Sequence, residues 1–199
     1  MPSATIWFLQ NLCRGADRLT NAPGKIYFDT DCIQTFILVR QEGLLAALYP
    51  GRIIIPGEVY REFCCPGRFM HELKERLDIM LAGRTAERMD IVTGSTEYMH
   101  YARLINPSPS GRRIIGRGEA SALALTLTYG GVVASNNLSD VKVYTTQYGL
   151  AHITTGDIML EAYDACRLDE QTGNRIWAEM CSRGRKIGAS TFSECIYNR

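Results

Sequence analysis

The feature that most constrains the fold is the stretch at residues 25–31, Lys-Ile-Tyr-Phe-Asp-Thr-Asp. A short apolar run that ends abruptly in two acids and a hydroxyl is typical of a buried parallel strand whose carboxyl end faces a cleft. Asp29 or Asp31 could also do no more than cap the following helix, because an N-cap acid needs no other role. The stretch therefore predicts a parallel α/β sheet, and a site if other strands also end in acids.

Short apolar strands alternate with helices along the rest of the chain. The β-branched run at residues 52–55 is typical of a strand buried on both faces. Further strands are expected over residues 25–28, 89–92, 132–135 and 151–154. Helices are expected over residues 31–42, closed by Gly43, and over 44–49, 57–63, 71–83, 95–104, 118–127, 137–149, 158–166 and 169–183, with a turn at 155–157 and an irregular tail. This alternation predicts a three-layer α/β/α sandwich around a central parallel β-sheet.

Length and composition indicate one domain. With 199 residues, 46% of them hydrophobic, the chain can bury one sizeable core. We expect residues 1–24 to form an N-terminal extension, residues 25–155 the core of the domain, and residues 156–199 a C-terminal helical part of the same domain. The apolar patch at residues 5–9 is too short to cross a membrane, so a cytoplasmic protein with no membrane partner is expected.

The charge balance and the cysteines exclude little. The 22 basic and 21 acidic side chains give a net charge of +1, which neither supports nor excludes an RNA partner. The cysteines are odd in number and lack metal-ligand spacing, so they are expected to be reduced core residues rather than zinc ligands. They are Cys13, Cys32, Cys64, Cys65, Cys166, Cys181 and Cys195.

Acids recur near the ends of other predicted strands. Glu62 lies on the helix after the second strand, Glu119 in the first turn of a mostly apolar helix, and Asp140 just beyond the fourth strand. Each acid alone is explained by the favourable helix dipole. Together they predict a metal site, because independent caps have no reason to converge on one sheet edge. Carboxylate oxygens are the ligands that Mg²⁺ and Mn²⁺ prefer.

Two of these motifs resemble the first and second motifs of the PIN-domain nucleases. The segment Phe-Asp-Thr-Asp at residues 28–31 is similar to the first acidic motif of that family. Residues 55–63, Ile-Pro-Gly-Glu-Val-Tyr-Arg-Glu-Phe, look like the second, in which the acid before the closing hydrophobic residue is functional. That match assigns the role to Glu62 rather than to Glu58.

The later motifs extend the resemblance over nearly all of residues 25–196. Residues 116–122, Gly-Arg-Gly-Glu-Ala-Ser-Ala, are similar to the Gly-Glu-Ala stretch of one PIN branch, and the segment at 176–192 resembles the C-terminal region of that branch. Residues 135–140, Ser-Asn-Asn-Leu-Ser-Asp, resemble the fourth motif of VapC-type toxins. Branch members often carry paired aspartates where this chain has Asn136 and Asn137, so Asp140 must supply the fourth acid.

The resemblance implies a PIN-like fold and a Mg²⁺- or Mn²⁺-dependent endoribonuclease with an acidic two-metal cleft. It assigns catalysis to four acids, with Asp29, Glu119 and Asp140 as direct metal ligands and Glu62 on the second metal or its water. Secondary hydrogen bonds are assigned to Thr30, Asp31 and Asn136.

The expected partners follow from the same resemblance. RNA is the expected substrate, and an acidic cleft needs basic walls to hold phosphates, for which the chain offers Arg112, Arg113 and Arg117. A toxin of this type would also have a protein antitoxin. Apolar helical faces near Leu38 and at residues 44–45 are compatible with a homodimer and equally with burial in the core.

Two other functions fit parts of the sequence. Residues 28–31 also match the Asp-x-Asp motif of haloacid-dehalogenase-like phosphatases, with Asp29 as nucleophile, Asp31 as acid/base and the segment from Gly156 to Glu161 as a metal motif. That hypothesis leaves Glu62 and Glu119 without a role. The second alternative is a PIN fold that has lost activity and binds RNA or protein, which the asparagine pair favours.

Overall fold

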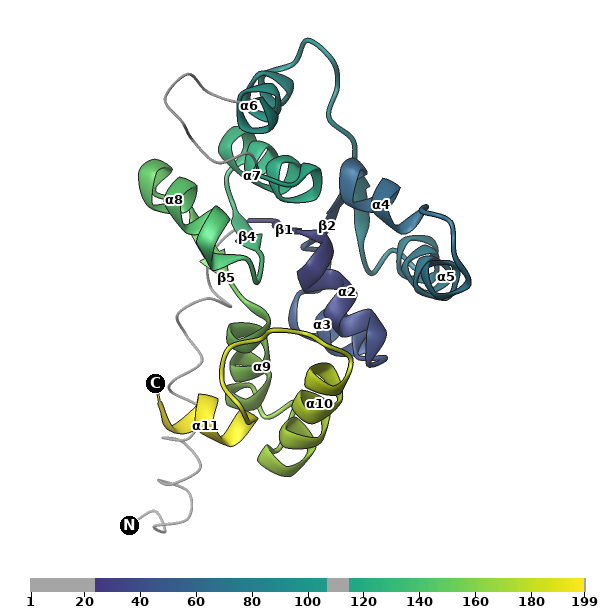
Figure 1. Ribbon diagram of the computed structural model, residues 1–199, viewed down its shortest axis with the longest axis vertical. Helices are drawn as coiled ribbons and strands as arrows, with labels where there is room; N and C mark the ends of the chain where they lie inside the picture. The colour runs from purple at the N-terminus through teal and green to yellow at the C-terminus, as the bar shows by residue number, and fades with distance from the viewer. Residues whose placement is uncertain (1–23, 107–114, 199) are drawn as a thin grey trace, which may run out of the picture.

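The structure, a computed structural model, describes residues 24–106 and 115–198. Its strands form one parallel sheet in the order β3-β2-β1-β4-β5 (Figure 1). The strands are β1 Ile26–Phe28, β2 Ile53–Pro56, β3 Glu87–Met89, β4 Val132–Ala134 and β5 Ala151–Ile153. Ile26 of the central strand β1 is in register with Ile53 of β2 on one side and with Val132 of β4 on the other. The carboxyl end of β1 is therefore the topological switch point, where open α/β sheets bind ligands.

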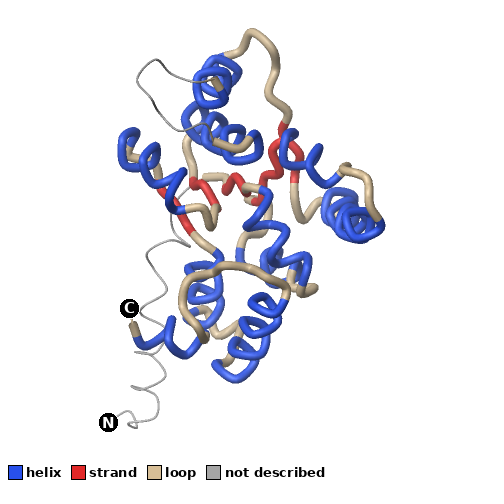
Figure 2. The backbone as a smooth tube through the Cα atoms, viewed as in Figure 1, coloured by secondary structure: helices blue, strands red, loops and turns tan. Residues whose placement is uncertain are grey.

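Helices cover both faces of this sheet (Figures 1 and 2). They are α2 Thr30–Leu38, α3 Glu42–Leu48, α4 Gly57–Phe63, α5 Arg68–Ala82, α6 Thr96–Ile105, α7 Arg117–Tyr129, α8 Leu138–Tyr148, α9 Thr155–Asp164, α10 Glu170–Ser182 and α11 Phe192–Tyr197. Ile26 and Phe28 pack into one core with α2, α3, α5, α9 and α10, whereas Tyr27 packs into a second core with α6, α7 and α8. Because successive strand residues point to opposite faces, β1 supplies both cores. The predicted three-layer α/β/α sandwich with a parallel sheet is confirmed.

The first predicted helix is shorter than the sequence suggested. Arg40 adopts a positive φ of 57°, which ends α2, and α3 begins at Glu42. Gly43 lies inside α3, so the prediction that it closes the preceding helix is wrong. The turn is held by backbone bonds, with the amide of Gln41 donating to the carbonyl of Phe36 at 2.8 Å. A non-glycine residue with positive φ has no strong sequence signal, which explains the error.

Three other element predictions need correction. The strand β3 begins two residues before the predicted segment begins and ends three residues before that segment ends, and its mostly exposed residues at the sheet edge lack an apolar pattern. Residues 155–157 form the first turn of α9 rather than a separate turn, because Thr154 and Asp157 cap each other. The tail is not wholly irregular, because α11 docks through Phe192, whose ring lies 5.9 Å from that of Trp177.

Burial also revises the expectations for cysteines and helix faces. Cys32 is buried, but the prediction that the cysteines are mostly core residues is wrong, since Cys64, Cys65, Cys166 and Cys181 are exposed. Leu38 and Leu45 are buried in the core and Leu44 is half-buried against it, so packing within the chain accounts for these apolar faces. Within the described residues, no helix is long and apolar enough to cross a membrane.

Candidate functional site

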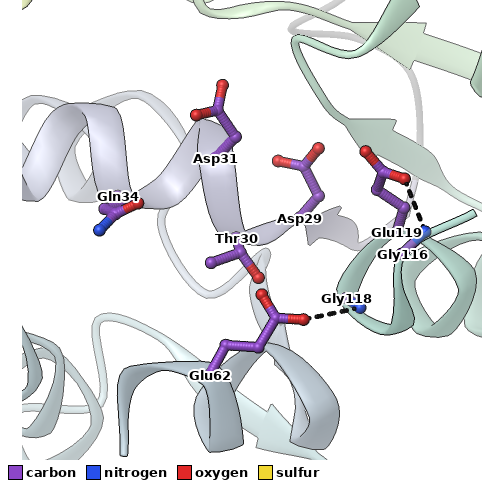
Figure 3. Close-up of a pocket in the computed structure, with 8 residues that line it drawn as sticks. All are labelled: Asp29, Thr30, Asp31, Gln34, Glu62, Gly116, Gly118 and Glu119. Atoms are coloured by element: carbon purple, nitrogen blue, oxygen red, sulfur yellow. Dashed lines mark hydrogen bonds between the residues drawn. The ribbon is translucent and has the colours of Figure 1, made fainter. Parts of the chain in front are cut away.

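A pocket of about 270 Å³ opens at the carboxyl end of β1 (Figure 3). It is lined by Asp29, Thr30, Asp31, Gln34, Glu62, Gly116, Gly118 and Glu119. The acids come from the start of α2, from α4 and from the first turn of α7. Segments far apart in the sequence thus deliver four carboxylates to one pocket, and three of them, Asp29, Glu62 and Glu119, belong to the predicted set of four acids.

Asp29 is the most buried of these acids, with 1% of its surface exposed. Its Oδ1 accepts a hydrogen bond of 2.7 Å from the Cys32 amide and so caps α2, as the capping interpretation expects. Its Oδ2 has no hydrogen-bond partner among the described residues. Burial raises the pKa of Asp29 to about 7, with smaller increases from Asp31 and Glu119. The Ser135 hydroxyl lies close enough to lower this pKa somewhat, although it makes no well-formed bond to Oδ2.

Glu62 is fixed by the first turn of α7. Its Oε1 accepts a hydrogen bond of 3.1 Å from the Gly118 amide (Figure 3). A Cβ atom on Gly118 would lie 2.6 Å from the Thr30 hydroxyl and 3.1 Å from Glu62 Oε1, so only glycine allows these groups to approach α7 this closely. The Thr30 hydroxyl is buried and has no hydrogen-bond partner in the described part of the chain.

Glu119 and Asp140 are joined through Asn137. The Asn137 amide nitrogen donates to Glu119 Oε1 at 2.7 Å and to Asp140 Oδ2 at 2.9 Å. The other oxygen of Glu119, Oε2, accepts from the Gly116 amide at 3.1 Å. Asp140 does not line the pocket, so its predicted role as a direct ligand requires it to reach past Asn137.

Asp31 is held at the rim by groups from the C-terminal half of the chain. Arg185 Nη1 donates to Asp31 Oδ1 at 2.7 Å, across 154 residues of sequence. Asn136 Nδ2 donates to Asp31 Oδ2 at 3.0 Å, while Asn136 Oδ1 accepts from the Thr155 amide at the start of α9. The predicted secondary role of Asp31 and Asn136 therefore has matching contacts, and Arg185 adds a cation that the motifs did not assign to the site.

The predicted basic wall is only partly described. Arg117 is exposed and begins α7 beside the pocket. Arg112 and Arg113 lie outside the described residues. The sequence interpretation also missed Gln34 and Asn137. Gln34 lies one turn beyond Thr30 on α2, and Asn137 lies three residues after the end of β4, at the N-cap of α8, so the positions of both could have identified them.

The pocket suits a hard divalent cation in the kind of donor it offers. Every ionisable side chain that lines it is a carboxylate, and Asp29 Oδ2 is an acceptor still without a partner. Such oxygens are the usual ligands of Mg²⁺ and Mn²⁺. Among the described residues, however, no three His, Cys, Asp or Glu side chains converge in an arrangement that could hold a metal ion. The type of donor therefore fits a hard divalent cation, whereas the side-chain positions in this structure do not form a complete set of ligands.

Of the residues in the phosphatase hypothesis, Asp29 and Asp31 line this pocket, but those of its metal motif do not. Asp157 Oδ2 accepts from the Thr154 amide and hydroxyl at 2.8 and 2.7 Å within the cap of α9. Glu161 accepts a 2.5 Å hydrogen bond from the buried Tyr49 hydroxyl. Both carboxylates thus make structural contacts and neither lines the pocket that holds Asp29, although Glu161 Oε1 has no hydrogen-bond partner among the described residues.

Comparison with known proteins adds no assignment. No protein-family model, no curated protein and no solved structure matches this chain. The resemblance of its motifs to PIN-domain nucleases therefore stays a prediction, and the candidate site is judged on its geometry.

Proposed function

We propose that this protein is a ribonuclease that cleaves RNA phosphodiesters with Mg²⁺ or Mn²⁺. The observation that carries the proposal is the pocket at the switch point, where four carboxylates include the buried Asp29 with an unpartnered oxygen. A buried carboxylate without a full set of partners is costly. A cation bound there would supply the missing interaction, which gives this arrangement a function.

In this proposal the chain positions the groups that handle substrate and water. A bound divalent cation would activate the attacking water and stabilise the leaving oxygen. Asp29 must lose its proton before it can act as a ligand, and Glu119 is oriented by Gly116 and Asn137. Glu62, held by Gly118, is placed to orient a water, and the buried Thr30 hydroxyl has no partner among the described residues.

Substrate binding and biological setting belong to the same proposal. The exposed Arg117 beside the pocket would contact RNA phosphates, a task for which the sequence also offers Arg112 and Arg113. The likeness to VapC-type motifs adds a protein antitoxin as partner and the cytoplasm as the place of action.

Cleavage of a mixed pool of labelled RNAs by the full-length protein tests this function. We expect cutting with Mn²⁺ or Mg²⁺ that stops in EDTA and is lost in Asp29→Asn and Glu119→Gln. Glu72→Gln is the matched control, because its carboxylate is exposed on α5 and pairs only at the surface with Arg68. Cutting that persists in both pocket variants would refute the proposed site.

The competing function is an inactive module that binds RNA or protein. It is favoured by one observation, that Glu119 and Asp31 already have protein partners on both oxygens. RNA binding that resists EDTA and survives replacement of all four acids, with no cleavage at any Mn²⁺ concentration, would support this alternative over the nuclease.

A further inference from the structure

Asn137 holds an unusual position between two acids of the candidate site. Both bonds from its amide nitrogen go to carboxylates, one to Glu119 at 2.7 Å and one to Asp140 at 2.9 Å. Its Oδ1 accepts from the Ser139 hydroxyl at 2.8 Å and from the Asp140 amide at 3.4 Å. These acceptor bonds fix the orientation of the amide, because a flipped side chain would place its oxygen against two carboxylates.

Two carboxylates that converge on one centre repel each other unless something positive lies between them. In a loaded acidic site that centre is a cation, which draws oxygens to about 2.0–2.1 Å for Mg²⁺. Here the centre is an amide NH₂, which carries only a partial positive charge. Glu119 also lines the pocket that contains Asp29, whose Oδ2 has no hydrogen-bond partner among the described residues. The Asn137 amide therefore binds an acid that shares a pocket with an unpartnered carboxylate oxygen.

We propose that the Asn137 carboxamide takes the place of a cation between Glu119 and Asp140. It holds the two carboxylates together in the metal-free protein, and a divalent cation can use both acids only by displacing it. Asn137 thereby weakens metal binding in the Asp140 half of the site and leaves Asp29 to recruit the first ion. This inference rests on the proposed metal-dependent function and deepens it, since it names the residue that sets how readily the site loads.

Capping of α8 is the competing explanation for the same contacts, because Asn137 is also the N-cap of that helix. Serine and aspartate are N-caps as good as asparagine but carry no NH₂ group. Asn137→Ser therefore removes the bridging donor and keeps a capping oxygen. Asn137→Asp does the same and adds a third carboxylate. Asn174→Asp is the matched control, because Asn174 likewise uses both ends of its amide, on Ser193 between α10 and α11, and neither residue lines the pocket.

The test uses the full chain without RNA. Melting temperature is measured in EDTA and with Mn²⁺, and Mn²⁺ affinity is measured by calorimetry. We expect both Asn137 variants to melt below the wild type in EDTA and to gain more from Mn²⁺ than it does. Asn137→Asp should bind Mn²⁺ about tenfold more tightly or better, the size of effect typical of residues that support metal ligands. Asn174→Asp should lose stability equally in both buffers, with its Mn²⁺ affinity unchanged.

The outcomes separate this inference from the proposed function. Unchanged Mn²⁺ affinity in both Asn137 variants would overturn the inference, even if the wild type cleaves RNA. Tighter Mn²⁺ binding by the variants would uphold it, even if the wild type cuts no RNA, in which case the proposed nuclease falls. If Asn137→Asp does not fold, Asn137→Ser decides the question, with the same direction of change and a smaller size.

Discussion

Asp29 combines two tasks that make opposite demands on its carboxylate. Its Oδ1 caps α2, which favours the charged form, whereas burial and the neighbouring acids favour the protonated form. The net result is a pKa of about 7, far above the value of about 3.9 expected in an unfolded chain. Without metal, ionisation of Asp29 near neutral pH therefore lowers the stability of the folded state relative to the unfolded chain.

This cost predicts a specific dependence of stability on pH. Below about pH 4, Asp29 is protonated in both the folded and the unfolded chain, so it does not lower the free energy of unfolding. As the pH rises toward 7, Asp29 ionises first in the unfolded chain, so the free energy of unfolding of the wild type falls. Asp29→Asn keeps a capping oxygen and cannot ionise. In EDTA, its free energy of unfolding should rise relative to the wild type between pH 5 and pH 8, toward an upper limit of roughly 4 kcal/mol at about 1.4 kcal/mol per pKa unit.

Denaturant unfolding at the two pH values measures this effect, and Asp169→Asn is its control. Asp169 is also an N-cap aspartate, but it is exposed, and the Thr172 amide lowers its pKa. Both its folded and unfolded forms are ionised from pH 5 to pH 8, so the difference between this variant and the wild type should stay constant. An Asp29→Asn difference that is equally flat would mean that the buried carboxylate is not destabilised in the fold.

At the scale of elements, α11 depends on one close contact with α10. A Cβ atom on Gly173 would lie 2.2 Å from Phe192 Cδ1, so the ring that anchors α11 occupies the space of a side chain. Gly173→Ala should therefore lower the free energy of unfolding by about 1–3 kcal/mol, the usual cost of overpacking, despite the better helix propensity of alanine. Thermal unfolding with Trp177 fluorescence measures this, because Trp177 packs against the same ring.

Gly43→Ala is the matched control for that prediction. Gly43 lies inside α3, and a Cβ atom there would meet nothing within 4 Å. The same substitution should then stabilise the protein by about 0.5–1 kcal/mol, which is the difference in helix propensity alone. If Gly173→Ala also stabilises, the ring of Phe192 can move aside and does not fix α11.

The elements that the sequence identified are those whose signal is local. The apolar run of β2 predicted a strand, and the Ser95 cap of α6 predicted the start of a helix. Both predictions are close, because residues adjacent in sequence determine burial on both faces and capping. The helix α11 has six residues and one buried anchor, and β3 is recruited by pairing with β2. Neither segment has a periodic pattern of its own. Contacts with segments distant in sequence determine where both of them form.

The same distinction holds for the candidate site. Asp29, Glu62 and Glu119 were predictable because each follows a strand or begins a helix that parallel topology brings to one edge. The bridge from Asn137 to Glu119 depends on side-chain orientation, which no motif specifies. The contact between Asp31 and Arg185 joins residues too distant in sequence for any local pattern to show it.

At the scale of the whole molecule, charge is nearly balanced but unevenly placed. The net charge is +1, yet four carboxylates line one pocket. Arg185 lies in the segment after α10, and its side chain is only 18% exposed. Its ion pair with Asp31 neutralises part of the negative charge of the pocket. Asn136 makes a second link, because it contacts both Asp31 and the start of α9. The C-terminal helices are thus connected to the pocket by polar contacts as well as by the core.

Removal of Arg185 should therefore change two properties in opposite directions. Arg185→Ala loses an ion pair and the packing of its stem, so the free energy of unfolding should fall by about 1 kcal/mol, a limited cost because Asp31 is partly exposed and keeps Asn136. The same change removes a cation from beside the acids, so Mn²⁺ affinity should rise. Arg183→Ala should alter neither property, because that side chain is exposed and its guanidinium lies 4.0 Å from the Glu179 carboxylate. Denaturant unfolding and calorimetry give the two values, and a fall in stability without a gain in Mn²⁺ affinity would limit Arg185 to a structural role.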